Sequence, residues 1–291
     1  MSSALARKDD ATADLVRGEF PFTGADFRAI AELLYAMAGI TLPEHKATLV
    51  YSRLAKRVRA LRLGSFQAYR ALLDSPEGED ERMNMLAALT TNVTRFFREP
   101  HHFDHLRDQV IAPLADAVRA GRRLRIWSAG CSTGQEPYSI ALTILGVIPE
   151  AARLDVRILA TDIDPNVVAT ARTAIYSEDQ VEPVPPALRQ KFMDRRGADW
   201  AVSSAARSLV TANTLNLMGD WPMKGRFDAI FCRNVVIYFD EPTQARIWSR
   251  FEPLLVPGGR LYVGHSERAS HPGSRLTSDG LTAYRAPGVL A

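Results

Sequence analysis

The chain has 291 residues, of which 46% are hydrophobic and 24% are charged. This composition is typical of a globular protein with room for one large domain and a small one. No stretch approaches the roughly 18 apolar residues of a membrane span, and the N-terminus lacks the apolar core of a signal peptide, so we expect a cytoplasmic protein without membrane insertion. The net charge of +3 is low for a protein that binds nucleic acid.

The first 90 residues divide into a tail and a small helical domain. Residues 1–20 are polar and charged, and we expect a flexible tail there. In residues 21–90 the apolar positions recur at helical spacing, with Thr23 expected to cap the first helix and Gly39 to end it. Three more helices are expected at about residues 45–63, 65–73 and 79–90.

The helix expected at about residues 45–63 has a basic face. Its cations are Arg53, Lys56, Arg57, Arg59 and Arg62. They form either the solvated side of an amphipathic helix or a surface that contacts an acidic partner. No aromatic residues alternate with the cations as a stacking platform for nucleic acid would require, and an acidic protein surface suits them equally well. We therefore expect no nucleic-acid partner.

Residues 91–118 are expected to link the helical domain to a larger domain over residues 91–291. Asn92 or Thr94 can cap this segment, and Arg98 offers a planar guanidinium suited to a carboxylate. Three histidines follow, namely His101, His102 and His105. No acidic or cysteine set at ligand spacing accompanies them, so no metal site is expected.

Residues 124–145 are the stretch around which the chain is organised. Apolar residues lead into a turn with Gly130 and Gly134 and then into an apolar helical pattern, so the sequence predicts a strand, a glycine turn and a helix. The glycine spacing is that of neither a dinucleotide-binding loop nor a P-loop. Glu136 at this turn would repel phosphate and attract a cation such as an ammonium group. The alternative is an ordinary turn with Glu136 solvated.

A second strand ends in two acidic residues, Asp162 and Asp164. Asp164 precedes Pro165 and is expected to cap the next helix. Asp162 stands at the end of the strand, where an acidic side chain can accept both ribose hydroxyls of a nucleoside. A ligand that contains a nucleoside and an ammonium group, and that needs no pyrophosphate, is S-adenosylmethionine.

The remaining chain completes an α/β pattern. Residues 176–211 interrupt it and are expected to form a small, partly antiparallel insertion that includes a strand at 207–211. A return through residues 214–218 is followed by a buried strand that runs into the polar, aromatic stretch ending at Asp240. A helix at about 242–255, a strand at 260–264 and a last pair of strands close the fold, which we predict to be a doubly wound α/β sheet.

Six motifs in this order resemble those of the chemotaxis-receptor glutamate methyltransferase family, the CheR type. They are Thr91–Glu99, Ser132–Ser139, Thr161–Asp164, Asn216–Leu217, Cys232–Phe239 and Gly258–Gly259. The resemblance covers residues 22–284 and implies a Rossmann-like S-adenosylmethionine-dependent methyltransferase with an N-terminal all-helical domain. It implies that the cofactor is surrounded by Asn92, Thr94, Arg98, Glu136, Asp162, Asn216, Leu217, Arg233 and Asn234.

The resemblance also implies an acceptor and a partner. Arg98 and Tyr238 are expected near the acceptor glutamate of a chemoreceptor, with the basic helix meeting the receptor's helical, acid-bearing region. A glutamate carboxylate is already ionised near pH 7, so it needs positioning and not a general base. The products are a glutamate methyl ester and S-adenosylhomocysteine. The turn at Gly197–Trp200 is short beside that of tail-binding members, so docking of a receptor tail peptide there is not expected, and a monomer is expected.

Two alternatives remain open at this point. The first is a methyltransferase of nucleic acid or small molecules, although an adenine-specific enzyme would carry an Asn-Pro-Pro-Tyr type of loop where this chain has Asn234–Tyr238. The second is a non-catalytic module that binds S-adenosylmethionine in signalling. The presence of both Arg98 and Tyr238 favours an enzyme.

Overall fold

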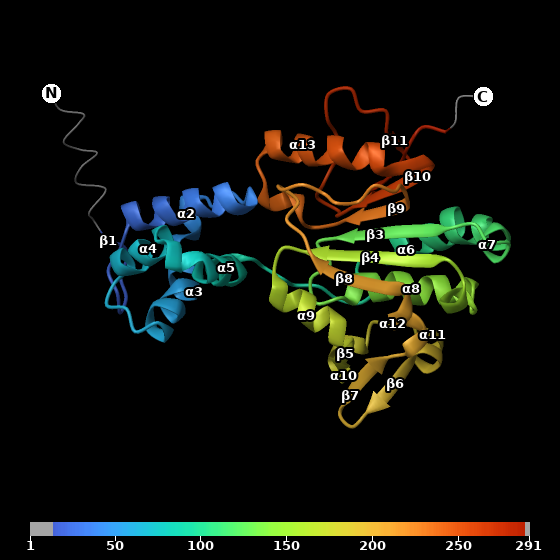
Figure 1. Cartoon of the computed structure of the whole chain (residues 1–291), viewed down its shortest axis with the longest axis horizontal. Coiled ribbons are helices and arrows are strands. Elements are labelled where there is room, and N and C mark those ends of the chain that lie inside the picture. The colour runs from blue at the N-terminus through green and yellow to red at the C-terminus, as the bar shows by residue number, and fades with distance from the viewer. Residues whose placement is uncertain (1–13, 289–291) are drawn as a thin grey trace. The chain divides into compact units, whose positions relative to one another are not determined.

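A computed structural model of the chain describes residues 14–288, which divide between Thr91 and Asn92 into two units (Figure 1). The flexible tail expected over residues 1–20 lies largely outside the described residues. For residues 14–20, which the structure describes, the expectation of a flexible tail needs correction, because Asp14–Val16 pairs as a strand with Phe22–Thr23. No helix of the described chain is both long and apolar enough to cross a membrane.

The smaller unit is mainly helical. Its elements are β1 (Asp14–Val16), β2 (Phe22–Thr23), α2 (Gly24–Ala38), the 3-10 helix η1 (Glu44–Lys46), α3 (Ala47–Ala60), α4 (Phe66–Asp74), the 3-10 helix η2 (Pro76–Gly78) and α5 (Glu79–Leu89). The predicted ends of α2 are confirmed. The Thr23 hydroxyl accepts a hydrogen bond from the Asp26 amide at 3.2 Å, and Gly39 ends the helix at a φ of +71°.

The basic face of α3 is only partly available to a partner. Arg53 donates to the carbonyl oxygens of three residues at the end of α5, the closest being that of Thr90 at 2.7 Å. Arg57 donates to the buried carboxylate of Glu81 at 2.9 Å. These two arginines therefore hold α3 and α5 together, which corrects the expectation of five cations on one open face. Arg59 pairs with Glu19, and Lys56 and Arg62 are exposed.

The larger unit is an α/β layer structure. Its helices are α6 (His101–Leu106), the π-helix η3 (Arg107–Ile111), α7 (Ala112–Arg119), α8 (Gln135–Val147), α9 (Pro165–Thr173), α10 (Glu178–Val181), α11 (Pro186–Phe192), α12 (Ser204–Leu209) and α13 (Glu241–Phe251), with 3-10 helices η4 (Ala151–Arg153), η5 (Val236–Tyr238) and η6 (Glu252–Leu254). Its strands are β3 (Leu124–Ala129), β4 (Val156–Asp162), β5 (Ile175–Ser177), β6 (Met193–Arg196), β7 (Asp199–Val202), β8 (Val210–Thr214), β9 (Phe227–Cys232), β10 (Leu255–Val263), β11 (Thr277–Ser278) and β12 (Ala283–Arg285).

The central sheet has seven strands in the order β11-β12-β10-β9-β3-β4-β8. The five strands from β10 to β8 pair in parallel, and β12 pairs antiparallel to β10. From β3 the chain moves outward to β4 and β8, then crosses to β9 and β10 on the other side. Ligands of doubly wound sheets bind at the carboxyl ends of the strands beside such a reversal. The predicted fold class is confirmed, and the carboxyl ends of β3, β4 and β9 are where a site is expected.

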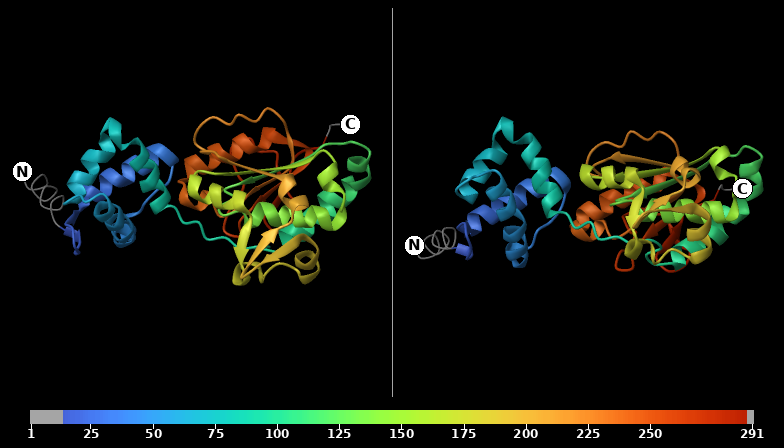
Figure 2. Two further views of the ribbon diagram at one scale, coloured as in Figure 1. Left: turned by 60° about the horizontal axis from the view of Figure 1, so that its bottom comes forward. Right: turned by 90° about the horizontal axis from the view of Figure 1, so that it is seen from below.

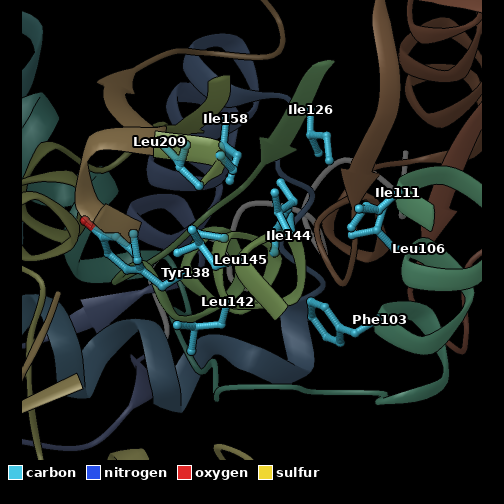
Figure 3. Packing of buried hydrophobic residues seen from close by; sticks show 14 of the residues in the cluster. Phe103, Leu106, Ile111, Ile126, Tyr138, Leu142, Ile144, Leu145, Ile158 and Leu209 are labelled. Carbon is cyan, nitrogen blue, oxygen red and sulfur yellow. The ribbon is translucent and has the colours of Figure 1, made fainter. Parts of the chain in front are cut away.

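Both faces of the sheet are covered by helices (Figures 1 and 2). On one face Ile126 and Ile158 pack with Ile144 of α8, in a cluster that also includes side chains of α6, α7 and α12 (Figure 3). On the other face Trp127 packs with Trp248 of α13. Each large apolar side chain that is fully buried contributes about 1.5 to 3 kcal/mol, so these two layers fix the strand ends rigidly.

The segment expected as a linker over residues 91–118 belongs to this core. Phe103 of α6 and Ile111 of the π-helix lie in the same buried cluster as α8 (Figure 3). Helical structure runs from His101 to Arg119, and its middle turn, Arg107–Ile111, is a π-helix. The stretch is therefore part of the wall that supports the sheet and not a free connection.

The inserted excursion is smaller than predicted. It forms a three-stranded antiparallel sheet in the order β5-β7-β6. The run 207–211, expected within it, instead leads into β8, which pairs in parallel with β4 at the edge of the central sheet. Leu209 is buried in the main core, and Ala212 is buried in a smaller cluster with Ala160 of β4, so the run belongs to the larger sheet.

Candidate active site

The glycine turn after β3 is locked against its neighbours on two sides. Gly130 and Gly134 have φ angles of +84° and +98°, which favour glycine. The amides of Gly130 and Cys131 donate to the Thr161 carbonyl at 2.7 and 2.9 Å, so the turn is tied to the end of β4. A Cβ on Gly130 would lie 2.2 Å from Cγ2 of Val235, so the loop after β9 also approaches this turn closely.

Asp162 occupies the predicted position at the carboxyl end of β4 and is buried. Its Oδ2 accepts a hydrogen bond from the Ser132 amide at 2.8 Å, and its Oδ1 accepts one from the Asp164 amide at 3.1 Å. Burial raises the pKa of Asp162, against which these backbone hydrogen bonds act. Asp164 caps α9 as predicted, accepting from the Asn166 amide at 2.9 Å.

Glu136 is paired within the protein. Its Oε1 accepts from the Ser128 hydroxyl at 2.7 Å, and its Oε2 lies 3.1 Å from Nη1 of Arg233. Burial raises the pKa of Glu136, and the Arg233 charge opposes that rise. The alternative of a solvated Glu136 at an ordinary turn is therefore wrong.

The guanidinium of Arg233 connects the end of β9 with the segment 92–100. Besides Glu136, it donates from Nη2 to the carbonyl oxygen of Arg98 and lies 3.3 Å from Oε2 of Glu99. It also lies 5.6 Å from the ring centroid of Phe103. Its Nε is buried and forms no hydrogen bond with any residue that the structure describes. One buried cation thus holds two carboxylates and one backbone carbonyl in fixed positions.

The segment 92–100 follows the edge of this site. Asn92 donates to the Asp164 carboxylate at 2.9 Å and accepts from the Ser132 hydroxyl through its carbonyl at 2.7 Å. The Phe97 amide donates to the Ser139 hydroxyl at 2.9 Å.

Further along the segment, Phe97 and Glu99 adopt φ angles of +50° and +58°, which L-residues rarely adopt. Arg98 stands between them, and its Nη1 donates to the Val93 carbonyl at 3.2 Å. Thr94 is half-buried.

The remaining predicted residues lie in two loops. Asn216 and Leu217 follow β8, whose register pairs Thr214 with Asp162. They stand in the loop through which the chain returns toward β9, and Asn216 accepts from the Met218 amide at 2.9 Å. Asn234 follows β9 with a φ angle of +59°.

Tyr238 ends the 3-10 helix η5, which follows Asn234 in the same loop. Its side chain is half-buried. The site thus takes residues from the ends of β3, β4, β8 and β9 and from the segment 92–100.

Comparison with known proteins identifies the family. The chain matches the family described as CheR methyltransferase, SAM binding domain, over residues 92–284, and the CheR methyltransferase, all-alpha domain, over residues 25–90. The chain belongs to the CheR methyltransferases. It is therefore an S-adenosylmethionine-dependent methyltransferase.

Named relatives of the CheR family match along most of the chain. A probable chemotaxis protein methyltransferase of Rhizobium etli is 53% identical over 258 residues, covering 87% of this chain and 96% of the relative. Chemotaxis protein methyltransferase 2 of Pseudomonas aeruginosa is 45% identical, covering 91% and 94% of the two chains. The chemotaxis protein methyltransferase of Escherichia coli is 42% identical, covering 89% and 90%.

The donor set of this CheR chain fits S-adenosylmethionine. Asp162 accepts one hydrogen bond at each oxygen, and an ionised carboxylate has about four acceptor positions, so capacity remains for ribose hydroxyls. The turn beside it carries glycine at 130 and 134 and therefore presents backbone and not bulky side chains. Glu136 supplies a second carboxylate at the same edge of the sheet.

Among residues 14–288 of this CheR chain, one group has ligand atoms close enough to hold a metal ion. Single ligand atoms of Glu99, His101 and His102 lie within 4.8 Å of one another. Nε2 of His102 lies 2.9 Å from the Thr282 hydroxyl, and burial lowers the pKa of His102 to about 3. Glu99 also forms an ion pair with the buried guanidinium of Arg233, with Oε2 and Nη2 3.3 Å apart. The absence of a metal stays a prediction.

Three supporting residues were missed from the sequence. Ser128 and Ser139 bond to site segments through their hydroxyls, and small polar residues in an apolar strand or helix give no distinctive signal. Glu267 accepts backbone hydrogen bonds from the loop after β9. The sequence signal for Glu267 is an acidic residue soon after the apolar strand β10, because a buried carboxylate needs hydrogen-bond donors around it.

Proposed function

We propose that this protein transfers the methyl group of S-adenosylmethionine to glutamate side chains in the helical cytoplasmic region of chemoreceptors. The products are glutamate methyl esters and S-adenosylhomocysteine. The observation that carries the proposal is the contact of the Arg233 guanidinium with both Glu136 and the Arg98 carbonyl. This contact brings Arg98, whose guanidinium suits an acceptor carboxylate, to the strand ends that also carry the carboxylates assigned to the donor. The names of the CheR relatives support the chemotaxis role.

We assign the donor site to nine residues. They are Asn92, Thr94, Arg98, Glu136, Asp162, Asn216, Leu217, Arg233 and Asn234. In this assignment Asp162 accepts the ribose hydroxyls, and Glu136 provides negative charge for the ammonium group. Bound S-adenosylmethionine supplies a methyl group activated by its sulfonium. The buried position of Asp162 and Glu136 keeps water away from these contacts and so strengthens them.

The acceptor needs orientation more than activation. A glutamate side chain has a pKa near 4.3 and is ionised at neutral pH, so no general base is required. Arg98 has N–H groups beyond the single one that bonds to Val93, and its planar fork matches a carboxylate. We assign Arg98 and Tyr238 to hold the acceptor carboxylate in line for transfer, which is the main catalytic task left to the protein.

The smaller unit supplies the partner surface in this proposal. Lys56 and Arg62 are exposed and make no ion pair with the described residues, and Arg59 adds a third cation that is bound only by the exposed Glu19. These three cations would meet an acidic, helical receptor segment. We propose that residues 21–90 and 91–291 act as separate domains of a monomeric, cytoplasmic enzyme.

One assay tests the proposed reaction. The protein is incubated with S-adenosylmethionine labelled in the methyl group and with chemoreceptor cytoplasmic fragments, and label on the receptor is measured before and after mild alkali. We expect label that alkali releases, because carboxyl methyl esters hydrolyse under these conditions. Alkali-stable label would indicate methylation of nitrogen, and binding of the donor without any transfer would indicate a non-catalytic module.

A further inference from the structure

Glu267 joins two strand ends through four backbone hydrogen bonds. Its Oε2 accepts from the amides of Asn234 at 2.7 Å and Gly264 at 2.6 Å. Its Oε1 accepts from the amides of Val235 at 2.9 Å and Val236 at 3.0 Å. The residue is buried. One carboxylate therefore satisfies three successive amides of the loop after β9 and one amide at the end of β10.

A carboxylate is the side chain that suits this position. Burying its charge is costly, and burial raises the pKa of Glu267 against the opposing effect of the backbone donors. A glutamine would offer one acceptor atom and would turn an amide NH₂ group toward two further donors. The four N–H groups thus compensate for the burial of this carboxyl group.

The loop 234–236 is also confined from other directions. A Cβ on Gly264 would lie 2.5 Å from Nδ2 of Asn234 and 2.7 Å from Oε2 of Glu267. Gly130 of the glycine turn approaches Val235 just as closely. Neither glycine leaves room for a side chain, so the loop has one available path between the ends of β3 and β10.

We propose that Glu267 is a positioning residue for methyl transfer. It fixes the amides between Arg233, which precedes the loop, and Tyr238, which ends the 3-10 helix that starts at Val236. This inference rests on the function proposed above for Arg233 and Tyr238. Displacement of a reacting group by about 1 Å can lower a rate by about 100-fold, so the loop must hold its path to hold Tyr238.

The test compares Glu267→Gln with Glu252→Gln as a matched control. Glu252 also accepts from a loop amide, that of Arg275 at 3.1 Å, and from the Ser274 hydroxyl at 3.1 Å. It contacts no residue assigned to the site. Three quantities are measured: hydrogen exchange at the four amides, the stoichiometry of S-adenosylhomocysteine binding by calorimetry, and kcat per binding site with receptor fragment.

For Glu267→Gln we expect exchange at the amides of residues 234–236 and 264 to rise on the order of tenfold or more, with exchange in β3 unchanged. We expect kcat per binding site to fall about 10- to 100-fold. Normalising to binding sites removes any loss that comes from unfolded protein. Glu252→Gln should match the wild type in kcat per site and in exchange at these four amides.

Two results would overturn the proposal. One is a kcat per site within about twofold of the wild type in Glu267→Gln. The other is an equal loss in Glu252→Gln. If Glu267→Gln does not fold, Glu267→Asp replaces it, because it keeps the carboxylate but shortens the side chain by one methylene group, and it should show the same loss. The exchange measurement needs no substrate, so it tests Glu267 even if the wild type fails to methylate receptors, a failure that would count against the proposed function instead.

Discussion

The carboxylate of Glu136 and the guanidinium of Arg233 form a buried ion pair with Oε2 and Nη1 3.1 Å apart, although 97 residues separate them in the chain. Glu136 lies in the first turn of α8, after the glycine turn, and Arg233 follows β9. The parallel pairing of β3 with β9 brings the two elements together. The pair therefore lies where the two halves of the doubly wound sheet meet.

Replacing Glu136 with glutamine should weaken donor binding. The variant leaves Arg233 with Glu99 as its only carboxylate partner within residues 14–288 and removes the charge assigned to the ammonium group. We expect the Kd for S-adenosylhomocysteine, measured by calorimetry, to rise about 10-fold or more, which corresponds to about 1.4 kcal/mol. Glu150→Gln removes an exposed partner of Arg119 and serves as the control, with an unchanged Kd.

Arg98→Ala and Tyr238→Phe should lower methyl transfer without unfolding the protein. Neither side chain is fully buried, so the free energy of unfolding should change by less than about 1 kcal/mol. We expect kcat/KM for receptor methylation to fall about 10- to 100-fold in each. Arg95→Ala is the matched control, an exposed arginine of the same segment that should retain full activity. Unchanged activity in both site variants would remove them from the acceptor site.

Gly130→Ala should destabilise the protein more than Gly121→Ala. Both glycines have positive φ, at +84° and +100°, but only the Cβ at 130 would collide with a neighbour, Cγ2 of Val235. We expect about 1 to 2 kcal/mol of destabilisation at 121 from backbone strain alone. At 130 the added overpacking should bring the loss to about 2 to 5 kcal/mol. Urea denaturation of the two variants measures the loss of unfolding free energy in each. Equal losses would show that the loop after β9 moves away from the added Cβ at little cost.

Acid should weaken the helical unit through Glu81. Burial raises the pKa of Glu81, but hydrogen bonds from Arg57 and Tyr69 outweigh it and hold this pKa below the usual 4.5. A carboxyl group with a lowered folded pKa stabilises the protein above its unfolded pKa, and this stabilisation is lost as the pH falls through the folded value.

We therefore expect the protection factors of the amides in α3 and α5, corrected for the intrinsic exchange rate at each pH, to fall below about pH 4.5. Glu81→Gln should be less stable than the wild type at neutral pH by about 2 to 3 kcal/mol and should show a weaker acid dependence. An acid dependence in Glu81→Gln as steep as that of the wild type would contradict this assignment.

The local features of the site were predictable from sequence. The glycine turn, the acid at the end of β4 and the cap at Asp164 each depend on neighbouring residues, because turn geometry and capping are local. Their positions in the structure agree with that local logic. The order of strands and helices gave the doubly wound sheet for the same reason, since each element carries its own hydrophobic period.

Features that depend on distant partners were not predictable. Nothing near Glu136 in the sequence indicates that its partner is Arg233. Likewise, nothing near Arg53 or Arg57 indicates that they donate hydrogen bonds to α5 and the residue after it. The run at 207–211 was placed in the insertion because strand propensity does not say which sheet accepts a strand. Burial of Leu209 in the main core and of Ala212 beside Ala160 of β4 decides that choice, and burial is a property of the folded chain.

A crystal structure with S-adenosylhomocysteine is the most direct test of the central claim. The account predicts the adenosine at the carboxyl ends of β3 and β4, with both ribose hydroxyls on Asp162 and the amino group near Glu136. It also predicts that the sulfur faces Arg98 and Tyr238. Product bound elsewhere, or an Asp162 carboxylate that makes no contact with the ribose, would contradict the account.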